Sequence, residues 1–234
     1  MMQAVIDDFN ERVGEVDDFL KVLERLENPA VVLYHRNTGR QLRVFEEGSL
    51  KVMKATVFLL IYNVVESAIR SAFACLYDRI ESDGMACPDL SAALRLVWIR
   101  QQFDRLDDDS ASPRNYREFA ETVANAIMQK STVSLSARAL PIAGNLDSAA
   151  IRKVCRAHGV SVRVHYRASG GSELETVKTQ RNALAHGSSS FSDCGQQYAV
   201  TDLKRIKQEA FVFVKSILRN LRRFVDDKDY VSRK

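Results

Sequence analysis

The sequence has few of the residues that covalent cross-links, metal centres and bound nucleotides require. Its four cysteines are scattered, without a single CxxC pair, at Cys75, Cys87, Cys155 and Cys194. This spacing argues against a zinc site or a disulfide framework and favours a reducing compartment. The sequence also lacks a glycine-rich phosphate loop, an HExxH helix, a nucleophile elbow and an EF-hand loop. We therefore expect neither a metal nor an organic cofactor.

Long hydrophobic runs are absent as well. The longest apolar run covers residues 55–65, which is too short to span a bilayer and contains Asn63. Residues 1–8 carry early acids and no apolar segment, so they do not resemble a signal peptide. There is no internal repeat, no low-complexity tract and no long linker. We expect a cytoplasmic protein without a membrane partner, built as one domain over residues 1–234.

Charge is plentiful, and its distribution is uneven. Residues 1–150 contain 17 Lys/Arg and 22 Asp/Glu, whereas residues 151–234 contain 17 Lys/Arg and 8 Asp/Glu. A basic half of this kind favours a polyanion such as nucleic acid. A solvated helix surface accounts for the same charges equally well.

Helical periodicity dominates the chain and predicts an all-α bundle. Two segments alternate instead: residues 30–49 fit either a short hairpin or an irregular loop, and residues 160–166 fit a short strand. Residues 107–113 form a polar, acidic loop. The predicted helices are 4–26, 49–80, 90–106, 114–130, 147–158, 172–186 and 201–225.

One stretch, residues 178–187 (KTQRNALAHG), organises the rest of the chain. Ser172 is a suitable N-cap for its helix, and Gly187 suits the left-handed position that ends one. At about 100° per residue, Asn182 and His186 share a face, whereas Arg181 and His186 lie roughly 140° apart. A regular helix cannot aim that arginine and histidine at one small target. Either the helix unwinds near Gly187, or another element or subunit completes the site.

The long helix predicted at 49–80 carries a polar stripe of Asn63, Glu66 and Arg70 on an otherwise apolar rod. The stripe is either an exposed seam with a weak Glu66–Arg70 pair or a polar wall that faces a site. A buried carboxylate needs a cationic partner, and Arg181 is one candidate.

Arginine and histidine together fit cleavage of RNA without a metal. Histidine exchanges a proton near neutral pH, so it suits the ribose 2′-hydroxyl or the leaving 5′-oxygen, and arginine matches the oxygens of a pentacovalent phosphate. The remaining histidines, His35, His158 and His165, fit turn or surface positions. Tyr34 and Tyr166 fit ordinary packing better than stacking on bases.

Four pieces of sequence in order resemble the HEPN-domain proteins, and in particular the MAE-type (RiboL-PSP-like) prokaryotic branch. They are Arg181 and His186 separated by four residues, the segment 62–67 (YNVVES), the loop 144–147 (GNLD) with Ile151-Arg152, and Ser190-Phe191 followed by Gly195. The resemblance covers residues 50–225, and residues 1–49 are less diagnostic.

This resemblance implies an all-α HEPN-like bundle that forms a homodimer, in which motifs from two subunits make a composite RNase site. Arg181, His186 and Asn182 would be the catalytic residues, and Glu66 and Asn63 would support them. Lys178, Arg70 and Ser188 would contact RNA. Some HEPN toxins carry a tyrosine two residues after the histidine, where this chain has Ser188, so neutralisation by nucleotidyl transfer is not expected.

We therefore expect a metal-independent endoribonuclease of a prokaryotic toxin–antitoxin or antiphage system, with a cognate antitoxin or inhibitor protein. The alternative is a catalytically silent HEPN module that binds RNA or a partner protein. A DNA-binding regulator is disfavoured, because no helix-turn-helix with a basic recognition helix is visible.

Overall fold

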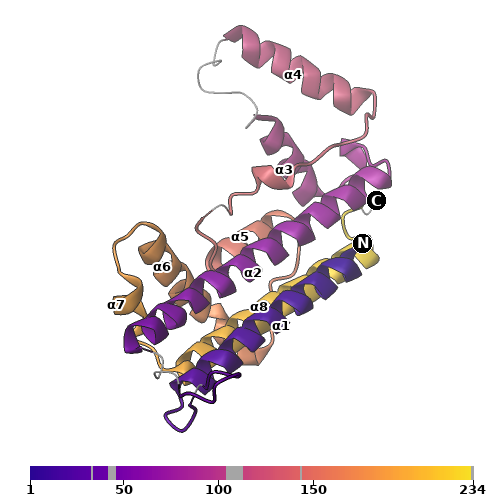
Figure 1. Ribbon diagram of the computed structural model, residues 1–234. Coiled ribbons are helices and arrows are strands. Elements are labelled where there is room, and N and C mark those ends of the chain that lie inside the picture. The colour runs from indigo at the N-terminus through magenta and orange to yellow at the C-terminus, as the bar shows by residue number, and fades with distance from the viewer. Residues whose placement is uncertain (33, 42–45, 104–112, 143, 233–234) are drawn as a thin grey trace.

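The computed structural model describes residues 1–32, 34–41, 46–103, 113–142 and 144–232, and over these residues it is an all-α bundle of eight helices without a strand. Figure 1 shows the long helices α1, α2 and α8 side by side. The α-helices are α1 (Met2–Glu27), α2 (Glu47–Ser82), α3 (Ala92–Phe103), α4 (Pro113–Met128), α5 (Ser148–Ala157), α6 (Glu173–Ala185), α7 (Phe191–Gly195) and α8 (Val200–Asp226). Short 3-10 helices are η1 (Cys87–Asp89), η3 (Ala137–Ala139) and η4 (Tyr166–Gly171).

Helix α2 is the centre of the fold. Its residues are apolar on most sides, so neighbours must cover it, and α1, α6, α7 and α8 all pack against it. By length and composition alone α2 could cross a membrane, but half of its most apolar stretch is buried inside the fold. Figure 1 shows α6 and α7 near the N-terminal end of α2, and α4 projecting beyond its opposite end.

The helix ends follow local chemistry. The Asp147 carboxylate accepts a hydrogen bond from the Ala150 N–H at 2.7 Å and so caps α5, as predicted. At the start of α8, Asp202 accepts from the Ala199 N–H at 3.0 Å. Gly187 ends α6 with φ of 69°. Ser172 occupies the N-cap position of α6, but its hydroxyl donates to the Ser169 carbonyl instead of capping the helix.

The strand predicted at residues 160–166 is wrong. Side chains, not a neighbouring strand, satisfy the backbone of this segment. Arg152 donates to the Val162 carbonyl at 3.1 Å, and Asn220 donates to the carbonyls of Ser161 and Arg163 at 2.9 and 2.8 Å. The segment therefore runs as an extended loop against α8 before it enters η4.

The other irregular segments are described only in part. Residues 34–41 make a tight turn closed by a single antiparallel bridge between Tyr34 and Gln41, with Gly39 at φ of 61°. The neighbouring residues 33 and 42–45 lie outside the described residues, as do residues 104–112, which hold most of the predicted acidic loop.

His158 lies at the turn that ends α5, as one of the two expected placements has it, but it is not on the surface. It is buried between Phe73 and Tyr77. Its Nδ1 lies 2.7 Å from the Val154 carbonyl, so Nδ1 carries the proton, and Nε2 accepts from the Tyr77 hydroxyl at 2.6 Å. Burial lowers the pKa of His158 to about 4.

Candidate functional site

Arg181 lies on α6 and is held from three directions. Its Nη1 donates to the Gly144 carbonyl at 3.2 Å and to Asn182 Oδ1 at 2.8 Å. The guanidinium also lies over the Tyr62 ring of α2, 4.4 Å from the ring centroid. Both hydrogen bonds come from Nη1. Within the described residues Nε and Nη2 have no hydrogen-bond partner, so they keep their hydrogens for another ligand.

The loop of residues 144–147 contacts both α6 and α2. Besides the Gly144 carbonyl, the loop provides Asn145, whose Oδ1 accepts from Asn182 Nδ2 at 3.1 Å. The buried Leu146 N–H donates to the Tyr62 hydroxyl at 3.2 Å. Gly144, Asn145 and Leu146 therefore each contact α6 or α2.

Asp147 is the last residue of the loop, and its carboxylate binds the Lys178 side chain. The Lys178 ammonium lies 2.6 Å from Asp147 Oδ2 and 2.9 Å from the Glu175 carboxylate. These partners raise the pKa of Lys178, with the hydrogen bond to Asp147 the largest cause. In this state Lys178 fixes α6 to the α5 cap. Its predicted contact with RNA stays a prediction.

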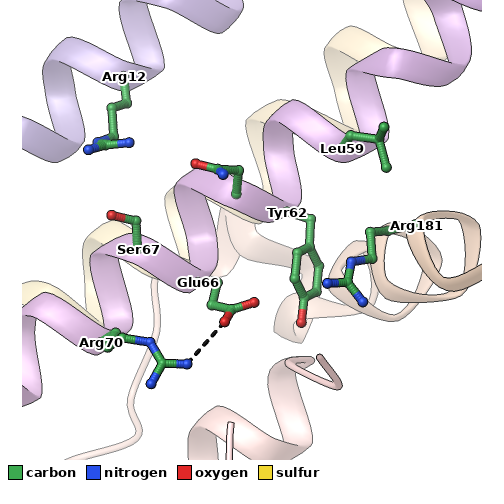
Figure 2. Close-up of a pocket in the computed structure, with 8 residues that line it drawn as sticks. Arg12, Leu59, Tyr62, Glu66, Ser67, Arg70 and Arg181 are labelled. Atoms are coloured by element: carbon green, nitrogen blue, oxygen red, sulfur yellow. Dashed lines mark hydrogen bonds and ion pairs between the residues drawn. The ribbon is translucent and has the colours of Figure 1, made fainter. Parts of the chain in front are cut away.

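A polar cavity of about 470 Å³ opens beside Arg181. The predicted stripe of Asn63, Glu66 and Arg70 forms one wall, so the stripe does face a cavity. Figure 2 shows the Arg181 guanidinium beside the Tyr62 ring on one side of α2, with Arg12 on the other side. The lining residues are Arg12, Leu59, Tyr62, Asn63, Glu66, Ser67, Arg70 and Arg181.

Glu66 pairs with Arg70 at 3.0 Å, as the dashed line in Figure 2 marks. The expectation that Arg181 is the cationic partner of Glu66 is therefore wrong, because the i,i+4 neighbour on α2 takes that position. Glu66 still lies next to the Arg181 site. Burial chiefly, and the Glu66 charge in smaller part, raise the pKa of the Tyr62 hydroxyl under the Arg181 guanidinium.

His186 lies apart from this cavity. It is the exposed C-cap residue of α6, and it does not line the cavity that Arg181 lines. Arg181 lines the cavity and His186 does not, although the two residues lie only five positions apart on α6. Within the described residues the imidazole has no hydrogen-bond partner. Ser188, two residues on, is exposed, and its hydroxyl donates to the Ala183 carbonyl at 3.3 Å.

The segment after the motif folds back on α2. Ser190 caps α7, because its Oγ accepts from the Asp193 N–H at 3.0 Å. Gly195 ends α7 so close to the Lys51 carbonyl of α2 that a Cβ at position 195 would overlap that oxygen. Glycine is therefore needed where α7 meets α2.

The sequence alone missed Arg12 as a residue of the site. It lies on the polar face of α1 and joins the cavity only through the packing of α1 on α2. Tyr62 and Gly144 belonged to the quoted motifs, but their contacts with Arg181 could not be derived from spacing. Among the described residues, no three His, Cys, Asp or Glu side chains lie close enough together to hold a metal ion.

A comparison with protein families connects this geometry to known proteins. The family described as MAE_28990-like HEPN matches residues 1–230, so the match includes α1 as well as the predicted core. Searches of curated proteins and of solved structures each found no significant match. The family match confirms the resemblance inferred from the four motifs, and the chain belongs to the MAE_28990-like HEPN family.

Proposed function

We propose that the protein is a metal-independent endoribonuclease, with Arg181 and His186 as its catalytic residues and Asn182 beside them. The single observation that carries this proposal is the fixed guanidinium of Arg181, which leaves Nε and Nη2 available at the edge of a polar cavity. A guanidinium with a fixed orientation suits phosphate oxygens, because its planar fork donates two parallel hydrogen bonds.

The proposed chemistry is transesterification within the RNA. The His186 imidazole accepts the proton of the ribose 2′-hydroxyl, the 2′-oxygen bonds to phosphorus, and the bond to the 5′-oxygen breaks as that oxygen takes a proton. Arg181 stabilises the negative charge of the pentacovalent phosphate. The products are a 2′,3′-cyclic phosphate and a 5′-hydroxyl end.

The position of His186 supports a homodimeric site. His186 is exposed at the end of α6 and Arg181 points into a cavity against α2, so one subunit does not direct both groups at one phosphodiester. A two-fold axis near the C-terminal end of α6 would bring a second arginine and histidine to the same cleft.

Within this proposal the stripe on α2 supports the site. Asn63 and Glu66 form its wall, and Glu66 keeps Arg70 at the cavity, where Arg70 can contact RNA together with the exposed Ser188. By its family resemblance the protein acts as a toxin or antiphage effector in a prokaryotic cell, restrained by a cognate antitoxin or inhibitor protein. The alternative remains a silent HEPN module that binds RNA or a partner.

The test is RNA cleavage in EDTA by the wild type, Arg181→Ala and His186→Ala, with product ends analysed. We expect cleavage by the wild type, 2′,3′-cyclic phosphate ends, and losses of a hundredfold or more for each variant. Ala183→Ser, which lies between Arg181 and His186 on the same helix but changes neither of them, is the matched control. Cleavage that requires magnesium, or that survives the histidine substitution, would refute the mechanism; no cleavage by any form, with RNA binding retained, would favour the silent module.

A further inference from the structure

A basic surface lies away from the Arg181 cavity, where the loop before α6 meets α8. Residues 148–172 contain five Lys/Arg and no Asp or Glu, and residues 210–225 contain four Lys/Arg and no Asp or Glu. The two segments are far apart in sequence but pack together, because η4 contacts α8. The contact includes the His165 N–H, which donates to the Ser216 hydroxyl of α8 at 3.1 Å.

The cations of this surface are largely unneutralised. Eight of the nine are exposed, and Arg152, the ninth, donates to backbone carbonyls. Within the described residues, only Arg222 of the eight forms an ion pair, with Asp226. The exposed cations of the two segments are Lys153, Arg156, Arg163, Arg167, Lys215, Arg219, Arg222 and Arg223. Lys153 lies apart from the contact between η4 and α8, in a pocket with Arg100 and Pro141. At the end of α8, Asp227 and Asp229 line a pocket together with Arg163 and Arg223, so carboxylates offset part of the charge there. The remaining excess of positive charge on this surface attracts a polyanion.

An aromatic side chain stands among these cations. Tyr166 is 78% exposed, so the packing role expected for it is wrong. Its ring centroid lies 4.4 Å from that of His165, and the Arg167 guanidinium lies 5.8 Å from the Tyr166 ring. Arg167 Nε donates to the Tyr166 hydroxyl at 3.2 Å, which holds the ring in place. A positioned aromatic ring among exposed arginines is the arrangement that stacks an unpaired base beside a bound phosphate.

We propose that this basic surface, centred on Arg163, Tyr166 and Arg219, is a second contact site for single-stranded RNA. It rests on the proposed function only in its choice of RNA as the ligand. The α6 axis alone separates Ser172, next to η4, from His186 by about 20 Å at 1.5 Å per residue. A dinucleotide at His186 is shorter than this separation, whereas a longer single strand can contact both ends of α6 and the segment before it.

The binding experiment uses the full chain with His186→Ala, in EDTA, and a fluorescent 20-nucleotide oligo(U). We expect Arg163→Glu/Arg219→Glu to weaken binding at least tenfold and to lower the salt slope of log K by about 1.4, since each phosphate contact contributes about 0.7. Tyr166→Ala should weaken binding about tenfold, and Tyr166→Phe should bind nearly as the parent does, because the ring remains.

The matched control reverses two exposed cations elsewhere, Lys21→Glu/Arg114→Glu, which changes net charge equally. Equal weakening by this control would overturn the proposal, and so would unchanged binding by the Arg163/Arg219 variant. The Arg163→Glu/Arg219→Glu variant is also tested on phosphatidylserine vesicles. If it lost binding to the vesicles but kept its binding to oligo(U), the proposal would be overturned and the surface would be assigned to membranes.

Cleavage assays separate this proposal from the catalytic one. With His186 intact, Arg163→Glu/Arg219→Glu should cleave the dinucleoside monophosphate UpA at the wild-type rate and a 20-nucleotide RNA at a severalfold higher KM. Wild-type KM for the long RNA would overturn the surface proposal and leave the catalytic one intact. If the wild type cleaves nothing but oligo(U) binding depends on Arg163 and Tyr166, only the catalytic proposal fails.

Discussion

At the residue scale, Tyr62 has two separable roles. Its ring lies under the Arg181 guanidinium, and its hydroxyl is the acceptor for the buried Leu146 N–H. The first contact orients a proposed catalytic group. The second anchors the loop of residues 144–147, which in turn supplies the carbonyl that binds Arg181.

Two substitutions at this position should therefore give different results. Tyr62→Phe leaves the Leu146 N–H without its acceptor, so we expect a loss of about 1–3 kcal/mol in the free energy of unfolding, with near-normal RNA cleavage at 25 °C. Tyr62→Leu should lose similar stability and also several-fold in cleavage, because the ring under Arg181 is gone. Urea unfolding and cleavage rates in EDTA measure the two effects. A Phe variant as inactive as the Leu variant would contradict this division.

His158 makes stability depend on pH. Its pKa is about 4 in the folded chain and 6.5 in the unfolded chain, so between these values the unfolded chain binds more protons. The contribution of neutral His158 to the free energy of unfolding is fully present above pH 6.5. It is lost as the pH falls toward 4, and the loss is about 3 kcal/mol in total.

The comparison that isolates this effect is between the wild type and Tyr77→Phe/His158→Leu, in which neither member of the pair is left unsatisfied. We expect the free energy of unfolding of the wild type to fall by about 2–3 kcal/mol more than that of the double variant between pH 7.5 and pH 4. Urea titrations at both pH values give this difference. Parallel losses in the two proteins would show that His158 does not titrate as its burial implies.

Single residues also show where the sequence was informative. Asp147 as a cap, Gly187 at positive φ and the divergence of Arg181 from His186 follow from backbone geometry within one or two turns, and the sequence predicted all three. The burial of His158 and the presence of Arg12 in the cavity depend on which helices pack together. Local periodicity does not contain that information.

At the scale of elements, the shortest described α-helix packs closely against the longest one. Helix α7 has five residues, and its Gly195 lies against the Lys51 carbonyl of α2. No side chain larger than hydrogen fits between these two backbones. Gly48, one turn earlier on α2, has open space around it.

Two glycine-to-alanine changes near this contact should therefore have opposite signs. Gly195→Ala places a methyl group on the Lys51 carbonyl and should destabilise the protein by about 1–3 kcal/mol or more, because α7 must move. In Gly48→Ala the added methyl group contacts no other atom, and alanine favours a helix more than glycine does. This variant should therefore stabilise the protein by about 0.5–1 kcal/mol. Thermal unfolding of both variants is the measurement. A neutral Gly195→Ala would mean that α7 separates easily from α2.

Long elements were easier to predict than short ones. Residues 4–26, 49–80 and 201–225 have enough turns for an apolar face to be unmistakable, and the structure places helices there. Residues 160–166 alternate as a strand does, but no strand partner exists among the described residues, and Arg152, Ser216 and Asn220 bind the backbone instead. The alternation of Val160, Val162 and Val164 reflects contact with the core on one side.

At the scale of the whole molecule, the proposed dimer has a test of its own. Arg181→Ala and His186→Ala chains, each inactive alone, should regain activity when mixed and allowed to exchange subunits. If each site takes its arginine and histidine from different subunits, statistical exchange restores about a quarter of the wild-type rate. Mixing either variant with Arg181→Ala/His186→Ala is the control. No recovery despite proven exchange would place both groups of one site in one subunit.

The four cysteines have a practical consequence for that question. All four are buried and free, and burial raises the pKa of the Cys155 thiol to about 12 and the pKa of the other three above the ordinary value. The native protein should therefore react slowly with maleimides. A cysteine introduced at the exposed Ser188 would be the preferred attachment point for a spin label or fluorophore. Two such labels would report the distance between the two 188 positions of a dimer, each two residues from His186.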